Sequence, residues 1–266
     1  MRAVNYYRPN SLAEAIKALK DDAEARLLAG GQTLLPTLKL RLAAPSLLVD
    51  LQGLAELRGI TVVGKAVRVG AMTTHAQLAH DAQVQRALPG LANLAADIGD
   101  RMVRNMGTVG GSVANSDPSA DYPAALLALD GTVITNGRRI PAGQFFRGLY
   151  ETALEAGEIV TGVEFAAVRR SAYLKFRSPA SRYAIVGVFI ADAESGPRVA
   201  VTGAASSAFR VPEYEAALNK GFRANALDAV AASFPALGGD VHASSEYRAD
   251  LIPIIARRAL AALLAA

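Results

Sequence analysis

The spacing of apolar residues changes several times within the first fifty residues. Apolar side chains three and four positions apart follow Ser11, and Ser11 with Glu14 forms the pattern of a capping box at a helix start. Short apolar runs flank this segment, and helical spacing returns after the second run. The pattern predicts strand, helix, strand, helix and strand, over residues 3–7, a segment beginning at Ser11, and residues 26–29, 34–42 and 47–50.

The middle of the chain alternates between strand and helix patterns. Apolar positions on either side of Gly64-Lys65 predict a hairpin, and Asn136-Gly137 favours a second hairpin with a type I′ turn. Residues 99–115 have too little periodicity for either element and are expected to be irregular. The remaining pattern predicts hairpin strands at 60–62, 67–69, 132–135 and 138–140, helices at 74–80, 91–98 and 124–129, and a strand at 159–165.

The pattern changes again after Val168. Three strands are expected around Tyr173, Ile185 and Val199, before Pro212, and helical segments follow as far as Ala266. The alanine-rich stretch 252–266 is interrupted by two arginines, so a packing helix is expected there. The chain is therefore expected to be α+β, with one domain at 1–168, split into subdomains of about 1–57 and 58–168, and another at 169–266.

Two short glycine segments hold the candidate chemistry. Residues 29–33 read Ala-Gly-Gly-Gln-Thr and lie between a predicted strand and a predicted helix, while residues 108–112 read Thr-Val-Gly-Gly-Ser. Glycine lacks a Cβ, so successive N–H groups can turn towards one anion, and a helix start favours negative charge. One Gly-Gly pair is usually an ordinary turn. Two that share the order small residue, Gly, Gly, polar favour a ligand of diphosphate size.

Length and composition limit the possible classes of protein. At 266 residues with 52% hydrophobic positions, two domains with a substantial core are expected. No apolar stretch is long enough to span a membrane and residues 1–10 lack the apolar core of a signal peptide, so a cytoplasmic protein is expected. The net charge of +4 is spread along the chain, which gives nucleic-acid binding little support. Arg101 and Arg104 fit solubility or anion attraction equally well.

The absence of cysteine restricts the redox chemistry of this chain. There is no thiolate to bind zinc or an iron–sulfur cluster, so any cluster has to lie on another chain. His75, His80 and His242 lack metal-ligand spacing and are expected at the surface without a metal. The sequence also lacks the glycine fingerprints of the Rossmann fold and of the P-loop, and no nucleophile motif points to hydrolysis.

These glycine segments and their surroundings resemble one family. The motifs Leu-Ala-Gly-Gly-Gln-Thr-Leu-Leu at 28–35, Lys-Leu-Arg-Leu at 39–42, Arg-Asn at 104–105, Thr-Val-Gly-Gly-Ser at 108–112, and Asp117-Pro118 with Asp121 are similar to those of molybdenum hydroxylase flavoprotein (medium) subunits. That family includes the carbon monoxide dehydrogenase medium chain and the xanthine dehydrogenase flavin domain. Gln32 and Ser112 stand where the carbon monoxide enzymes have histidine and aspartate, so the resemblance does not single out carbon monoxide oxidation.

The resemblance implies a fold, a cofactor and a set of binding residues. The fold would be a two-subdomain FAD-binding domain of the vanillyl-alcohol-oxidase (PCMH) type, followed by a smaller domain of sheet and helices. Without the family, Asp121 also fits a helix cap, Lys175 a solvated strand-edge charge, and Tyr183 core packing instead of stacking on the flavin. The FAD-binding residues implied are Leu28, Ala29, Gly30, Gly31, Gln32, Thr33, Leu34, Ile98, Thr108, Gly110, Gly111, Ser112, Asn115, Asp117, Asp121, Val160, Lys175 and Tyr183.

The resemblance also implies a role for the chain in a larger enzyme. An iron–sulfur small subunit would pass electrons from a molybdopterin large subunit to FAD on this chain, and FAD would pass them to an external acceptor. The complex would be a dimer of heterotrimers, and no side chain of this subunit is assigned a catalytic role. Two alternatives stay open, a self-sufficient flavin oxidoreductase of the same fold and a non-catalytic anion-binding scaffold.

Overall fold

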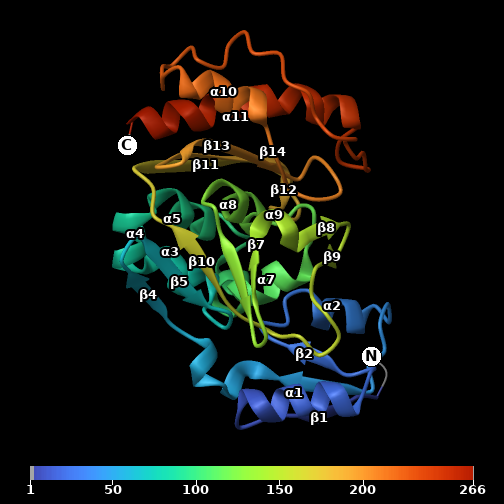
Figure 1. The fold of residues 1–266 in the computed structure, drawn as a ribbon. Coiled ribbons are helices and arrows are strands. Elements are labelled where there is room, and N and C mark those ends of the chain that lie inside the picture. Colours follow the sequence, from blue (N-terminus) through green and yellow to red (C-terminus); the bar gives the residue numbers. More distant parts are fainter. Residues whose placement is uncertain (1–2, 266) are drawn as a thin grey trace.

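The computed structural model describes residues 3–265 and arranges them in three stacked parts, each built on its own sheet. Figure 1 shows the amino-terminal sheet and helix α1 at one end, a central part of strands and short helices, and the carboxy-terminal helices at the other end. The three sheets draw on residues 5–50, 60–166 and 170–210 in chain order. The domain limits given above stay a prediction.

The first sheet is small and parallel. Its strands are β1 (Asn5–Tyr7), β2 (Arg26–Leu28) and β3 (Leu47–Asp50) in the order β1-β3-β2, and helices α1 (Leu12–Asp21) and α2 (Leu34–Lys39) connect them. The predicted order of elements is confirmed. Ser11 caps α1 by accepting from the Glu14 amide, but the Glu14 carboxylate accepts from the Asn10 amide. The reciprocal half of the predicted capping box is therefore wrong.

The second sheet has five antiparallel strands in the order β4-β5-β10-β6-β7. Its inward-facing Val67, Val69 and Val163 join the largest buried cluster, which also takes in the apolar faces of the neighbouring helices. Strands β4 (Ile60–Val63), β5 (Ala66–Gly70), β6 (Thr132–Thr135), β7 (Arg139–Pro141) and β10 (Val160–Ala166) alternate with helices α3 (His75–His80), α4 (Ala82–Ala87), α5 (Pro89–Ala96), α8 (Tyr122–Ala128) and α9 (Ala142–Phe145). Short elements complete this part: the 3-10 turns Leu51–Gly53 and Ala55–Leu57, and the hairpin β8 (Phe146–Gly148) with β9 (Glu151–Thr152).

The expectation that residues 99–115 are irregular is wrong. They form α6 (Arg101–Met106) and α7 (Val109–Asn115), and each helix has a side-chain cap. Asp100 accepts from the Val103 amide and Thr108 accepts from the Gly111 amide. A helix of fewer than two full turns has too few apolar residues for helical spacing to be recognised. The capping residues Asp100 and Thr108 were the remaining indication of these helices in the sequence.

The third sheet, in the order β11-β12-β13-β14, is covered on one face by the long carboxy-terminal helix (Figure 1). Every residue of β12 is buried, and α11 packs across β11 and β12 as the packing helix predicted. The elements are β11 (Arg170–Arg177), β12 (Ala184–Ala193), β13 (Gly196–Thr202), β14 (Phe209–Arg210), α10 (Pro212–Asn219) and α11 (Ser245–Ala265). No helix within residues 3–265 is both long enough and apolar enough to cross a membrane.

The predicted run of helices to the end of the chain is only partly correct, and Ala266 lies outside the described residues. Residues 220–244 contain no helix. Arg248 of α11 holds this segment against the sheet, since its guanidinium donates to the Ile185 carbonyl at 2.7 Å, to the Gly203 carbonyl, and to the Asp240 carboxylate at 2.7 Å. Arg248 thus connects the non-helical segment, through Asp240, to backbone carbonyls of the third sheet and its following turn.

The hairpin of β6 and β7 has a turn of another kind than predicted. Neither Asn136 nor Gly137 has a positive φ, so the turn is not type I′. The Asn136 amide donates to the Ile159 carbonyl, and its side-chain oxygen accepts from the Ile159 amide at 2.7 Å. The long-range pairing of Asn136 with Ile159 thus overrides the local turn preference.

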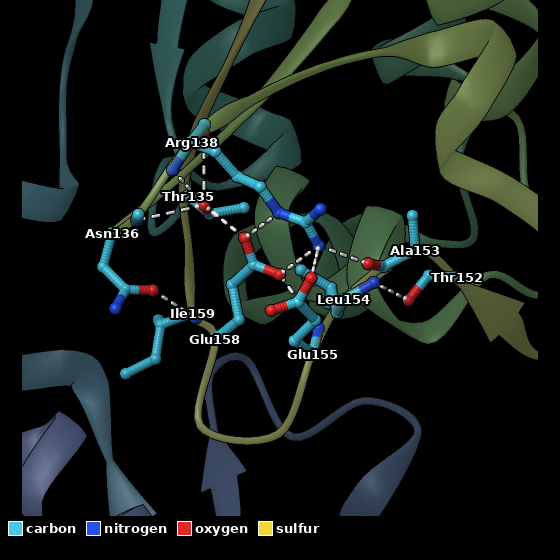
Figure 2. A network of polar contacts seen from close by, with 10 residues as sticks. Thr135, Asn136, Arg138, Thr152, Ala153, Leu154, Glu155, Glu158 and Ile159 are labelled. Atoms are coloured by element: carbon cyan, nitrogen blue, oxygen red, sulfur yellow. Dashed lines mark hydrogen bonds and ion pairs between the residues drawn. The ribbon is translucent and has the colours of Figure 1, made fainter.

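A charged network holds this turn to the loop that precedes β10. Figure 2 shows the Arg138 guanidinium beside the carboxylates of Glu155 and Glu158, at 3.1 Å and 2.9 Å. Glu158 also accepts from the Thr135 hydroxyl at 2.6 Å and from the Glu155 amide at 2.9 Å. Hydrogen bonds from Arg138, with those from Thr135 and the backbone, lower the pKa of Glu158 to about 2. The network fixes the chain immediately before Ile159 and Val160.

Glu158→Gln is expected to lower the free energy of unfolding by about 1–2 kcal/mol at pH 7, because a partly buried, charge-assisted network loses its anion. The pKa of Glu158 is lower in the folded chain than when unfolded, so its contribution is complete above about pH 4.5 and declines as the pH falls towards 2. Urea unfolding at pH 7 and at pH 3.5 checks this, with exposed Glu24→Gln as the control. An equal loss in both variants at pH 7 would contradict it.

Candidate functional site

A single cavity brings the two glycine segments together. It has a volume of about 410 Å³ and is lined by both segments, by α3 and α6, by the start of β10, and by the loop between β11 and β12. The segments are more than seventy positions apart in the chain and still face one space. The cavity therefore draws its walls from all three parts of the molecule, the third through the loop between β11 and β12.

Glycine is required where these backbones touch. A Cβ on Gly30 would lie 2.1 Å from the Met106 carbonyl oxygen and 2.8 Å from Gly107 Cα. A Cβ on Gly110 would lie 2.4 Å from the Ala71 side chain. Real Cβ atoms do not come this close to other heavy atoms, so a side chain at Gly30 would push the first segment away from the end of α6, and one at Gly110 would push α7 away from Ala71.

The first segment carries free backbone donors. Within residues 3–265, the amides of Gly30, Gly31, Gln32 and Thr33 donate to no other group of the protein. Gly31 has a φ of +69°, a conformation that favours glycine, and Thr33 precedes α2 without capping it by its side chain. Consecutive free amides at a turn form a concave donor surface that suits an anion.

The second segment differs, because its amides from Val109 to Ser112 are engaged inside the protein. The Val109 amide donates to Thr73, the Gly110 amide to Ala71, and the Gly111 amide to the Thr108 hydroxyl. Within the described residues the Thr108 amide donates to no other group, so for this segment the expectation that backbone amides hold a diphosphate stays a prediction that rests on Thr108. Its glycines let α7 pack closely on β5 and on the first segment, where a Cβ on Gly111 would lie 3.4 Å from the Ala29 side chain.

A closed ion pair lies at the wall formed by α8 and β11. The Asp121 carboxylate accepts from the Lys175 ammonium at 3.0 Å and 3.2 Å and from the Tyr173 hydroxyl. Lys175 is fully buried and also lies 3.9 Å from Asp97, so it is no solvated strand-edge charge. Asp121 does not cap α8 with its side chain. Burial raises the pKa of Asp121, and Lys175 and Tyr173 oppose that rise.

One tyrosine, Tyr183, lines the cavity, and a second, Tyr150, contacts the lining residue Asp117. Tyr183, on the loop after β11, is 43% exposed, and partial burial together with the nearby Asp117 carboxylate raises its pKa. The Tyr150 hydroxyl donates to Asp117 at 3.3 Å. Tyr183 therefore lines the same cavity as the first glycine segment, and it is not packed in the core.

His75 is a site residue that the sequence did not indicate. The expectation that it lies at the surface is wrong, because it is 4% exposed and lines the cavity, whereas His80 and His242 are exposed. Its Nδ1 lies 2.9 Å from the Tyr122 hydroxyl, 47 positions away. No local motif marks such a distant pair.

Arg104 forms hydrogen bonds to the backbone, a role beyond the solubility and anion attraction considered in the sequence analysis. Its guanidinium donates to the carbonyls of Ile98 and Gly99 at 3.0 Å, so it fixes the turn before α6. Arg101 is exposed. Such a hydrogen bond from a side chain to the nearby backbone does not alter the spacing of apolar residues, so the sequence pattern could not predict it.

The structure brings nearly all of the expected binding residues to one space. Leu28 and Lys175 do not line it, since both are buried behind the wall. The expected residues that line it are Ala29, Gly30, Gly31, Gln32, Thr33, Leu34, Ile98, Thr108, Gly110, Gly111, Ser112, Asn115, Asp117, Asp121, Val160 and Tyr183. Those not foreseen are Arg26, Leu27, Leu51, Ala71, Met72, His75, Gly99, Val103, Gly107, Ala114, Ala120, Ile159, Ser181 and Arg182. The described residues contain no His, Asp and Glu cluster that could hold a metal ion.

Relatives of known sequence and structure match the chain along its whole length. The nicotine 6-hydroxylase medium subunit of Paenarthrobacter nicotinovorans is 35% identical, over 97% of this chain and 96% of its own. The carbon monoxide dehydrogenase structure from Hydrogenophaga pseudoflava contains a chain with a TM-score of 0.89 and 35% identity, covering 99% of this chain and 98% of that one. Quinoline 2-oxidoreductase from Pseudomonas putida 86 gives a TM-score of 0.86 at 30% identity, over 98% and 97%.

A protein family accounts for the part of the chain that holds both glycine segments. Residues 2–166 match the family described as the FAD binding domain in molybdopterin dehydrogenase. The α+β fold and the position of the cavity agree with this match. The chain belongs to this family of FAD-binding domains of molybdopterin dehydrogenases.

Proposed function

We propose that this chain is the FAD-carrying electron-transfer subunit of a molybdenum hydroxylase. The observation that carries the proposal is the cavity between the two glycine segments, in a chain of a family named for FAD binding. The medium subunits of nicotine 6-hydroxylase and carbon monoxide dehydrogenase are its relatives over nearly their full length. The role is that of an oxidoreductase subunit, with substrate oxidised elsewhere in the complex.

The residues present fit a dinucleotide. The free amides of the first segment would hold the diphosphate, since an anion is the partner that consecutive unpaired N–H groups favour. Ile98 and Val160 offer apolar walls for ring systems, and Asp117 and Asn115 offer acceptors for ribose or ribityl hydroxyls. The other expected residues that line the cavity are proposed to complete the FAD-binding site.

The chain's own residues orient the cofactor and set its surroundings. FAD, when bound, exchanges single electrons with metal clusters and electron pairs with an acceptor. Tyr183 at the rim is placed to control access to the cavity, and the Lys175–Asp121 pair keeps a positive and a negative charge buried in its wall. No proton transfer by a side chain is needed in this role.

The partners follow from what this chain lacks. It has no cysteine, so the clusters that feed it lie on an iron–sulfur small subunit, and substrate is oxidised on a molybdopterin large subunit. A dimer of heterotrimers, with an external electron acceptor, is the assembly proposed. A cytoplasmic location is also part of the proposal, and cell fractionation with immunodetection tests it.

Titration of the full chain with FAD tests the proposal. We expect stoichiometric binding with quenched flavin fluorescence, and reduction of the bound flavin only when the two partner subunits and their substrate are added. A chain that binds no FAD would contradict the proposal and leave an anion-binding scaffold. A chain whose flavin is reduced by substrate without partners would be a self-sufficient oxidoreductase.

Gly31→Ala is expected to weaken FAD binding by tenfold or more, because a side chain disfavours the positive φ that orients the free amides. The same strain should lower the free energy of unfolding by about 1 kcal/mol. Gly64→Ala is the control for the positive φ alone: Gly64 has a φ of +58° in a distant hairpin and a Cβ there meets open space, whereas a Cβ on Gly31 would also lie 2.8 Å from Leu35 Cδ1. Gly64→Ala should lose no more stability than Gly31→Ala and should keep FAD affinity, as measured by urea unfolding and fluorescence titration. Equal FAD affinity in both variants would count against the assigned role of Gly31.

A further inference from the structure

His75 lies where the two glycine segments come together. It occupies the first turn of α3, next to the N-cap Thr74, and its amide donates to the Gly107 carbonyl. A Cβ on Gly107 would lie 2.6 Å from His75 Nε2, and a Cβ on Gly30 would lie 2.8 Å from Gly107 Cα. The imidazole therefore packs against Gly107, which in turn contacts Gly30 of the first segment and directly precedes the second segment.

The partner of Nδ1 decides which ring nitrogen carries the proton. The Tyr122 side chain is fully buried, and within residues 3–265 His75 Nδ1, at 2.9 Å, is the one hydrogen-bond partner of its hydroxyl. If Nδ1 carried the proton, the Tyr122 proton would have no acceptor, and a buried unsatisfied hydroxyl is costly. Tyr122 therefore donates to Nδ1, and the neutral imidazole carries its proton on Nε2.

Nε2 has no protein partner of its own. No hydrogen bond within the described residues involves it, and it is not among the buried polar atoms sealed from solvent. Since His75 lines the cavity, the free N–H is available to a ligand there. Such an N–H suits an oxygen acceptor and would repel a ligand donor.

We propose that His75 donates a hydrogen bond through Nε2–H to a diphosphate oxygen of the bound dinucleotide, with Tyr122 as the positioning residue that fixes the tautomer. This inference rests on the proposed function. The amides of Val109, Gly110 and Gly111 are engaged within the protein, so His75 adds a side-chain donor on the side of the cavity where the backbone offers few.

The charge state of the ring agrees with this role. Burial, together with the nearby Arg104, lowers the pKa of His75 to about 4. Burial also raises the pKa of Tyr122 well above its ordinary value, so the hydroxyl keeps the proton that it donates. The site thus offers a neutral donor at physiological pH.

The tautomer can be measured on the full chain without any substitution in the cavity. The sequence has only three histidines, so ¹⁵N NMR of histidine-labelled protein gives three ring systems, and His80→Phe and His242→Phe assign the other two. We expect His75 to be protonated on Nε2 and not on Nδ1 at pH 7, and the Nε2 signal to shift when ADP is added. An Nδ1–H tautomer, an imidazolium, or a signal that ignores ADP would overturn the inference.

Affinity measurements test the hydrogen bond itself. His75→Phe keeps an aromatic ring without a donor and should weaken both FAD and ADP by about tenfold. His80→Phe makes the same change at the exposed end of α3 and should leave both affinities unchanged. Tyr122→Phe should weaken both ligands several-fold and let the Nδ1–H tautomer of His75 appear.

The outcomes separate the inference from the proposed function. A wild-type chain that binds no FAD refutes the proposed function, and the inference falls with it. A wild-type chain that binds FAD while folded His75→Phe binds FAD and ADP equally well overturns the inference alone. Loss of FAD affinity with ADP affinity unchanged also overturns it, because the donor would then serve the flavin end and not the diphosphate.

Discussion

The contact between Gly30 and the end of α6 is the constraint on which the site depends. Backbone meets backbone there so closely that a single methyl group on Gly30 would collide with the Met106 carbonyl. The contact holds the amino-terminal sheet at a fixed distance from the central helices, and the cavity is the space that remains beside it. Met72 and Ile159, from the central part, pack with Val49 and Leu51 of the first part and secure the same junction.

This junction gives the two glycine segments different tasks. In the first segment, the turn at Gly31 leaves consecutive amides free, so the backbone itself can bind an anion. In the second, Gly110 allows α7 to lie against Ala71, and the amides from Val109 to Ser112 form hydrogen bonds within the fold. Two similar sequence motifs therefore contribute in unlike ways, one through hydrogen-bond donors and the other through close packing.

Much of the fold could be predicted because its signals are local. Alternating apolar strands, the Ser11 cap and the glycine pairs each act within a few residues, and the structure has the elements they indicate. The short helices α6 and α7 were missed, since neither completes two turns. The pairs of His75 with Tyr122 and of Asp121 with Lys175 join residues 47 and 54 positions apart, and only the folded chain brings them together.

The electrostatics of the cavity follow from how its charges are matched. Lys175 is the buried cation nearest the wall, yet Asp121 neutralises it and Asp97 lies close by, so its field inside the cavity is much weaker than that of an isolated ammonium. Arg104 is turned to the carbonyls of Ile98 and Gly99. The amides of residues 30–33 are the consecutive uncharged donors available to an anion in this cavity, beside the charges of Arg26 and Arg182, which also line it. Such donors hold a ligand by direction as well as by attraction, which is what a subunit needs if it keeps its cofactor in one orientation through many electron transfers.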